Sequence, residues 1–141
     1  TLLKKNNNAD PMLRHAAILA LARIADAAQL IAAANNESAA VRLGAVVALR
    51  RLQRKEVGLF LQDADPLVVL EAARAINDEP IPAAVSDLAA VATRPDQSEA
   101  LLRRVMNANF RLGGPRMLPP LRRSLPTAKF LKRCVWKQSK N

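Results

Sequence analysis

The stretch "DPLVVLEAARAINDEP", residues 65–80, has the clearest helical pattern in this chain. An Asp-Pro dipeptide opens it and the Asn77-Asp78 pair closes it, and both are turn or cap signals. Between these signals, only Glu71 and Arg74 carry charge. The apolar positions recur with the spacing of one face of an α-helix: Val68, Val69, Ala72, Ala73 and Ile76. The stretch therefore predicts a helix whose buried face is lined mainly by small side chains.

The same pattern returns along the chain, and internal repeats of this kind indicate a stacked architecture. Residues 13–24 align with residues 41–52 at an offset of 28, with apolar or small residues at matching positions. The stretch at 65–80 supplies a third copy at an offset of 27, and a weaker fourth copy follows at an offset of 34. The fourth copy is aligned on Leu102, Met106 and Phe110. Four registers of one pattern predict four equivalent helices.

A shorter helical stretch precedes the second, third and fourth copies, at residues 26–34, 55–62 and 81–93. Asp26 is a predicted N-cap, and the Asp10-Pro11 and Asp65-Pro66 dipeptides place an acid before a proline in the first turn. The repeating unit is therefore an antiparallel helix pair of about 30 residues, a size that stacks into solenoids. Alanine at the recurring positions lets successive helices approach closely.

The stretches "DPMLRHAAILALARI", "SAAVRLGAVVALRRL" and "DPLVVLEAARAI" resemble HEAT repeats, in particular the short HEAT-like type found in phycobilin lyases. The resemblance covers roughly residues 9–112. It implies an all-α fold, a right-handed α-solenoid of about four HEAT-like helix pairs. Because HEAT arrays serve many tasks, it implies little about function.

A narrower resemblance rests on "VRLGAVVALRRL", "DADPLVVLEAARAINDEPIP" and "LLRRVMNANFRLGG". These stretches are similar to the HEAT region of large bacterial proteins that join a sugar-dehydrogenase-like propeller to a HEAT array and a c-type haem domain. The resemblance implies a structural segment of such a haem-containing protein, located outside the cytoplasm; without it, we expect a cytoplasmic protein. The redox chemistry of those proteins is expected on their other domains, and the sequence has no CxxCH motif. We therefore expect no cofactor on this chain.

The positive charge of the chain is concentrated near its C-terminal end. The formal net charge is +10, which by itself suggests nucleic-acid binding. Residues 1–112 contain 14 Lys or Arg against 12 Asp or Glu, a balance of +2, whereas residues 113–141 contain 8 basic residues and no acidic one. We therefore divide the chain into a HEAT-like repeat array, residues 1–112, and a basic tail, residues 113–141.

Three interpretations of the tail stay open. It is a basic arm that binds nucleic acid or an anionic surface, or a solvated, disordered end. The third interpretation comes from the genetic code. With permissible codons, a reading frame shifted by one base turns the segment from Met117 onward into an alanine-rich helix, a turn and another Leu-Arg-x-x-Ala copy. A frameshifted fifth repeat would carry charge that was never selected for binding, and the encoding DNA decides this.

Few residues are candidates for chemistry. Cys134 is the only cysteine, which excludes a disulfide within the chain and a Cys-based zinc site. His15 is the only histidine and has no second His or Cys near its turn, so we expect no metal or haem ligation. The Gly113-Gly114 pair is interpreted as a helix C-cap rather than a phosphate loop. We predict no catalytic residue, no metal site and no enzymatic activity.

Arginines recur along the repeats in two groups. We assign Arg14, Arg42 and Arg103 to one repeat position and interpret them as a ladder. The ladder ties each unit to acids or carbonyls of a neighbouring turn, such as Asp10, Glu37 and Asp65. The alternative is a positively charged surface that meets an acidic partner. A second group of charged residues on the long helices is predicted to bind a partner: Arg23, Arg51, Glu71 and Arg74.

We therefore expect a non-catalytic scaffold or protein-interaction module whose partner is another protein or a neighbouring domain of a longer chain. Binding of nucleic acid through the basic tail is the alternative from another class. No run approaches the roughly 18 uncharged apolar residues of a membrane span. The chain begins with Thr1 and not Met, which we interpret as a sign of a fragment. An incomplete first unit and an irregular last one predict marginal stability or self-association through uncapped ends.

Overall fold

The computed structural model describes residues 1–91 and 97–113. All regular structure in these two ranges is helical, and they contain no strand. The all-α class predicted from the sequence is therefore confirmed. The elements follow in the order α1 (Leu2–Asn6), α2 (Pro11–Ile24), α3 (Ala27–Ala32), the 3₁₀ helix η1 (Ala33–Asn35), α4 (Ala39–Arg51), the 3₁₀ helix η2 (Lys55–Gln62), α5 (Pro66–Asn77), the 3₁₀ helix η3 (Pro82–Ala84), α6 (Val85–Ala90) and α7 (Glu99–Arg111).

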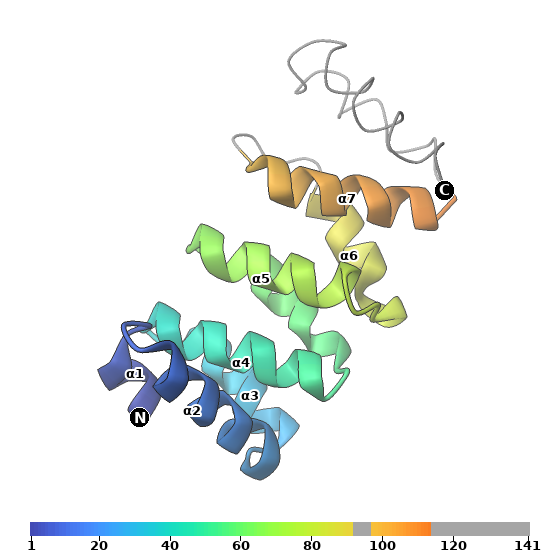
Figure 1. Cartoon of the computed structure of the whole chain (residues 1–141). Helices are drawn as coiled ribbons and strands as arrows, with labels where there is room; N and C mark the ends of the chain where they lie inside the picture. Colours follow the sequence, from blue (N-terminus) through green and yellow to red (C-terminus); the bar gives the residue numbers. More distant parts are fainter. Residues whose placement is uncertain (92–96, 114–141) are drawn as a thin grey trace.

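The four long helices, α2, α4, α5 and α7, are the four copies of the repeated pattern. They run in the same direction and follow one another along the molecule (Figure 1). Contacts join α2 to α4, α4 to α5, and α5 to α7. Of the shorter helices, η2 contacts α4 and α5, α6 contacts α5 and α7, and α3 contacts α4. Each long helix therefore packs against the long helix before or after it, and α4 and α5 pack against both.

The predicted Asp-Pro dipeptides begin two of the long helices. The Asp10 carboxylate accepts hydrogen bonds from the amides of Met12 and Leu13 at 2.7 and 3.1 Å. The Asp65 carboxylate accepts one from the amide of Leu67 at 2.8 Å. Each bond satisfies an amide that has no partner within its own helix, and the proline that follows has no amide hydrogen to satisfy.

The short helical stretches also form, with differences in detail. Residues 26–34 form α3 and η1, and Asp26 caps α3 in a capping box with Gln29. Residues 55–62 form a 3₁₀ helix, and residues 81–93 form η3 and α6, with 92–96 outside the described ranges. The sequence pattern did not predict α1, which packs its Leu3 against Ile18 and Val41.

Small residues at equivalent positions form the contact between long helices. Ala45 and Ala48 of α4 are fully buried, as are Ala72 and Ala75 of α5. They belong to one core that also includes residues of η2, α6 and α7. A methyl group holds neighbouring helix axes only slightly apart, so these positions set the spacing of the long helices.

The register of the fourth copy differs from the prediction by one residue. The buried residues of α7 have the same spacing as those of α5 at an offset of 33, not 34: Leu101, Val105, Ala108 and Asn109 match Val68, Ala72, Ala75 and Ile76. The predicted line through Phe110 was therefore wrong for the core, because the Phe110 side chain is 85% exposed. One residue corresponds to a rotation of about 100° around a helix.

Gly113 follows α7 with φ 73°, the left-handed conformation that glycine adopts at helix ends. Its amide donates to the Phe110 carbonyl at 3.0 Å. The predictions made for the rest of the tail, including the frameshifted repeat, concern residues 114–141, which lie outside the described ranges.

Candidate protein-interaction surface

Arg42 is the member of the predicted ladder that ties one unit to the next. Its guanidinium donates to both carboxylate oxygens of Asp63, at 2.7 and 3.0 Å, and to the carbonyls of Asn36 and Glu37 at 2.7 and 3.1 Å. The Asp63 side chain is only 4% exposed. The hydrogen bonds to Asp63 raise the pKa of Arg42. This bidentate pair connects α4 to the turn before α5.

Asp63 was not predicted as the acid of this pair, although Asp65 was. Asp65 caps α5, and its own amide donates to the Asp63 carboxylate at 2.8 Å. In the Asp-Ala-Asp turn, Asp65 therefore caps α5, whereas Asp63 pairs with Arg42 of α4. Two acids so close together in sequence give no signal that separates these roles.

Arg14 occupies the same repeat position as Arg42 and makes no ion pair within residues 1–91 and 97–113. The residue equivalent to Asp63 lies 21 positions after the arginine. After Arg14 that residue is Asn35, which carries no charge. Asp10, the other predicted acid, is occupied by the cap of α2. The ladder position is thus charged in the first unit but has no acid to pair with.

Arg103 does not lie at the ladder position. It pairs with Glu99 on its own helix, one turn away. Arg104 instead reaches back to the end of α5 and donates to both Asp78 oxygens at 3.1 and 2.7 Å, and to the Ala100 carbonyl at 2.9 Å. The register of α7 explains the difference, because at an offset of 33 the ladder position falls on Leu102.

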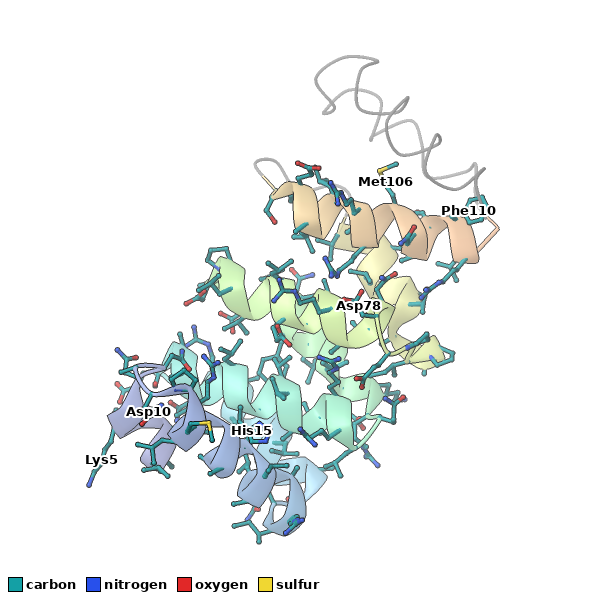
Figure 2. All side chains as sticks on the ribbon, in the orientation of Figure 1. Lys5, Asp10, His15, Asp78, Met106 and Phe110 are labelled. Carbon is teal, nitrogen blue, oxygen red and sulfur yellow. The ribbon has the colours of Figure 1, made fainter. Side chains whose placement is uncertain are left out.

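Asp78 lies where α5 contacts α7, and its pKa is lowered there. Burial alone would raise the pKa of Asp78, but hydrogen bonds from Arg104 and Asn77 outweigh it and lower the pKa below the ordinary value of an aspartate. Asp78 follows the last residue of α5 and lies close to the start of the next unit (Figure 2). The carboxylate therefore stays charged where two units meet.

Glu71 and Arg74, two of the predicted partner-binding residues, interact with each other and with α4. Arg74 contacts Glu71 at 3.2 Å, and Arg50 contacts the other Glu71 oxygen at 3.5 Å. Arg50 also donates to Glu79 at 2.7 Å, and this hydrogen bond lowers the pKa of Glu79. The charges of Glu71 and Arg74 are thus already compensated by each other and by Arg50.

Arg23 and Arg51, the other two predicted residues, lie at one repeat position, in the last turns of α2 and α4. Both side chains are exposed, and neither makes an ion pair within the part of the chain that the structure describes. The equivalent residue of α7 is Arg111, which donates to the Asn77 carbonyl at 3.1 Å. We name the residues at this position, Arg23, Arg51, Asp78 and Arg111, the C-terminal edge.

Two asparagines of the long helices are buried. Asn109 occupies a core position of α7, and its amide donates to the carbonyls of Val105 and Ala89 at 2.9 and 3.3 Å. Asn77 donates to Asp78 at 2.8 Å. Asn107 is exposed. Asn77 and Asn109 therefore act inside the helix stack and not at its surface.

His15 is exposed on α2 (Figure 2). Within residues 1–91 and 97–113, no three His, Cys, Asp or Glu side chains come together in a way that could hold a metal ion. In the same residues, each helix is too short or too polar to cross a bilayer.

Comparisons with family models, with curated proteins and with solved structures find no match for this chain.

Proposed function

We propose that the chain is a right-handed HEAT-type α-solenoid of four helix pairs that acts as a non-catalytic scaffold or protein-interaction module. The proposal is supported by the four long helices, which share one direction and contact one another in chain order (Figure 1). It is also supported by the burial of alanine at equivalent positions of α4 and α5. Stacked repeats of this kind present extended surfaces that recognise partners over several units.

The single observation that carries the proposal is the contrast among the arginines. Arg42, Arg50 and Arg104 are held by acids of the neighbouring unit. Arg23 and Arg51 stand at one repeat position, are exposed and make no ion pair in the described part of the chain, although the charge of Arg51 helps to lower the pKa of Glu79. The carbonyl ends of α2 and α4 stabilise a positive charge there but do not neutralise it.

A partner that fits the C-terminal edge is an acidic segment of another protein or of a neighbouring domain. Guanidinium groups bind carboxylates through paired hydrogen bonds, so two arginines in adjacent units favour an extended acidic segment over a single acid.

The experiment measures the affinity of the full chain for a short fluorescent polyglutamate peptide by anisotropy at several salt concentrations. We expect the double variant Arg23→Ser/Arg51→Ser to bind about 5-fold more weakly, because two exposed ion pairs are lost.

The matched control is Lys5→Ser/Lys55→Ser, which removes the same charge from two exposed lysines that lie off the C-terminal edge. The basic tail is present in both variants, so its contribution to peptide binding cancels. An equal loss of affinity in both variants would show that only net charge matters and would refute the proposed surface.

The charge of residues 113–141 favours one second candidate, nucleic-acid binding through the tail. The test is duplex DNA binding by the full chain in a salt series, with a tail variant in which Lys129, Lys132 and Arg133 are replaced by Gln. Salt-sensitive affinity that falls in this variant supports the second candidate. Affinity that depends instead on Arg23 and Arg51 would place the DNA on the C-terminal edge and count against a protein partner there.

A further inference from the structure

The two ends of the helix stack expose apolar residues. On α2 they are Leu13, Ala16, Ala20 and Ile24, which we name the first end face. On α7 they are Leu102, Met106 and Phe110, which we name the last end face. Leu102 and Met106 are partly buried, and Met106 also packs against the core. Met106 and Phe110 lie on the side of α7 that faces away from α5 (Figure 2). Phe110 and Ile24 are 85% and 81% exposed, the highest values among large hydrophobic residues in the described ranges.

The contacts between neighbouring long helices show which side of each helix faces the preceding helix and which faces the following one. Arg50 of α4 reaches forward to Glu79, immediately after α5, at 2.7 Å. Arg104 and Arg111 of α7 reach back to Asp78 and to the Asn77 carbonyl. Positions equivalent to Arg50 therefore face the following long helix. Those equivalent to Glu79, Arg104 and Arg111 face the preceding one.

The repeat alignment identifies the equivalent positions on α7 and α2, at the two ends of the described helices. Phe110 is equivalent to Arg50, through offsets of 27 and 33. Ile24 is equivalent to Glu79, through offsets of 27 and 28. Phe110 thus lies at a position that faces the following long helix in the inner units, and Ile24 at one that faces the preceding long helix. Among the described residues, no long helix lies against either position. The place of the Arg50–Glu79 ion pair is taken by the two most exposed large hydrophobic residues.

A second polar contact between α5 and α7 also has equivalent positions on α2 and α7. Arg111 donates to the Asn77 carbonyl at 3.1 Å between α5 and α7. Arg23 is the residue of α2 equivalent to Arg111, and Phe110 is the residue of α7 equivalent to Asn77. An α2 helix stacked on α7 would therefore bring Arg23 to the Phe110 carbonyl, at the negative end of the helix dipole.

We propose that copies of this chain associate head to tail, with the first end face of one copy stacked on the last end face of another. In this proposal, the interface between two copies has the geometry of the contact between α4 and α5. Phe110 lies against Ile24 where Arg50 lies against Glu79. Because the two faces differ, the contact is heterologous and leaves a free face at each end, so assembly continues beyond a dimer.

The test is sedimentation velocity of the full chain over a range of concentrations. The sedimentation coefficient of the wild type is expected to rise with concentration, with little dependence on salt. Phe110→Arg and Ile24→Glu are each expected to weaken association at least about 10-fold, because each places an unpaired charge in an apolar contact. Circular dichroism confirms that each variant is folded.

The matched control is Leu59→Glu. Leu59 is a large, exposed apolar residue of η2 and belongs to neither end face. We expect this variant to associate like the wild type. If it loses association as fully as the two end-face variants, exposed apolar area alone drives the process and the proposal is overturned.

A mixture of the Phe110→Arg and Ile24→Glu chains tests the register itself. Alone, each variant is expected to associate more weakly than the wild type. In the mixture, one kind of contact places the new arginine beside the new glutamate, as Arg50 lies beside Glu79. The other kind keeps Phe110 against Ile24. Association is expected to return and to become sensitive to salt.

Two results would overturn the proposal: a wild type that stays monomeric at every concentration, or a loss of association in Phe110→Arg with none in Ile24→Glu. The second result would indicate a contact of α7 with itself or with another segment. Arg23 belongs to both proposals, but sedimentation is measured without an acidic partner, so neither outcome depends on whether the C-terminal edge binds one.

Discussion

Helices α2 and α5 are two copies of one sequence pattern with very different surroundings. Seven of the twelve residues of α5 are buried, whereas Ile18 is the only buried residue among the fourteen of α2. Both begin with a capping aspartate and a proline, and both have apolar or small residues at equivalent positions. What differs is the number of neighbours, because α5 has a long helix on each side and α2 on one.

A single repeat unit therefore does not supply its own stability. An alanine-rich helix has little apolar surface of its own, and it becomes buried only when a neighbour of the same shape lies against it. The centre of the stack should therefore respond strongly to substitution and the first unit weakly.

The largest expected difference concerns Ile76 of α5 and Leu21, its equivalent on α2. Ile76 is fully buried, so Ile76→Ala should lower the free energy of unfolding by about 2–5 kcal/mol through lost burial and a cavity. Leu21 is only partly buried, and Leu21→Ala should cost less than half as much. Urea unfolding of the full chain measures both. Equal losses would contradict the idea that the end helix is poorly supported.

The next comparison is between Arg42 and Arg14, at one repeat position. Arg42→Met leaves the Asp63 carboxylate, 4% exposed, without its cation and should cost about 2–3 kcal/mol. Arg14→Met removes no ion pair of the described residues and should change stability by less than about 0.5 kcal/mol. Thermal unfolding of the two variants decides. Adding Asp63→Asn to Arg42→Met should recover part of the loss, because the uncompensated charge is gone.

A smaller effect would come from making the first unit more like the second. Asn35→Asp places an acid where Asp63 stands in the next unit, within the register of Arg14. We expect a gain of about 0.3–1 kcal/mol at low salt, since the new pair is partly exposed. The gain should vanish in the Arg14→Met background. A gain that survives there would come from helix capping or net charge and not from the new pair.

The smallest expected effect is the pH dependence of the Arg104–Asp78 pair. The folded chain lowers the pKa of Asp78, so the pair stabilises the fold above the unfolded value of about 3.9 and is lost as the pH falls through the lower folded value. Below about pH 4, the unfolding free energy of the wild type should fall more steeply than that of Asp78→Asn. Parallel pH profiles of the two proteins would show that Asp78 has the same pKa in the folded and unfolded chain.

Local features of the fold follow from the sequence because they need only nearby residues. The caps at Asp10, Asp26 and Asp65 depend on amides two or three positions away, and all three were predicted. The four long helices were predicted for the same reason, since helical spacing is visible within one stretch.

The register of α7 could not be read in the same way. Two apolar lines run along this helix, one through Leu101 and Val105 and the other through Leu102 and Met106, and both have helical spacing. Only contact with α5 and α6 selects the first line for the core. That choice also decides that Arg104, and not Arg103, reaches the neighbouring unit.

The helical character of this chain, the four copies of one helix pattern and the starts of most helices can be predicted from the sequence. The buried face of each helix and the acid that pairs with each arginine depend on how the helices pack. Helix formation and capping need only residues within one turn. The choice of face depends on a neighbouring helix distant in sequence, and a shift of one residue turns a side chain by about 100°.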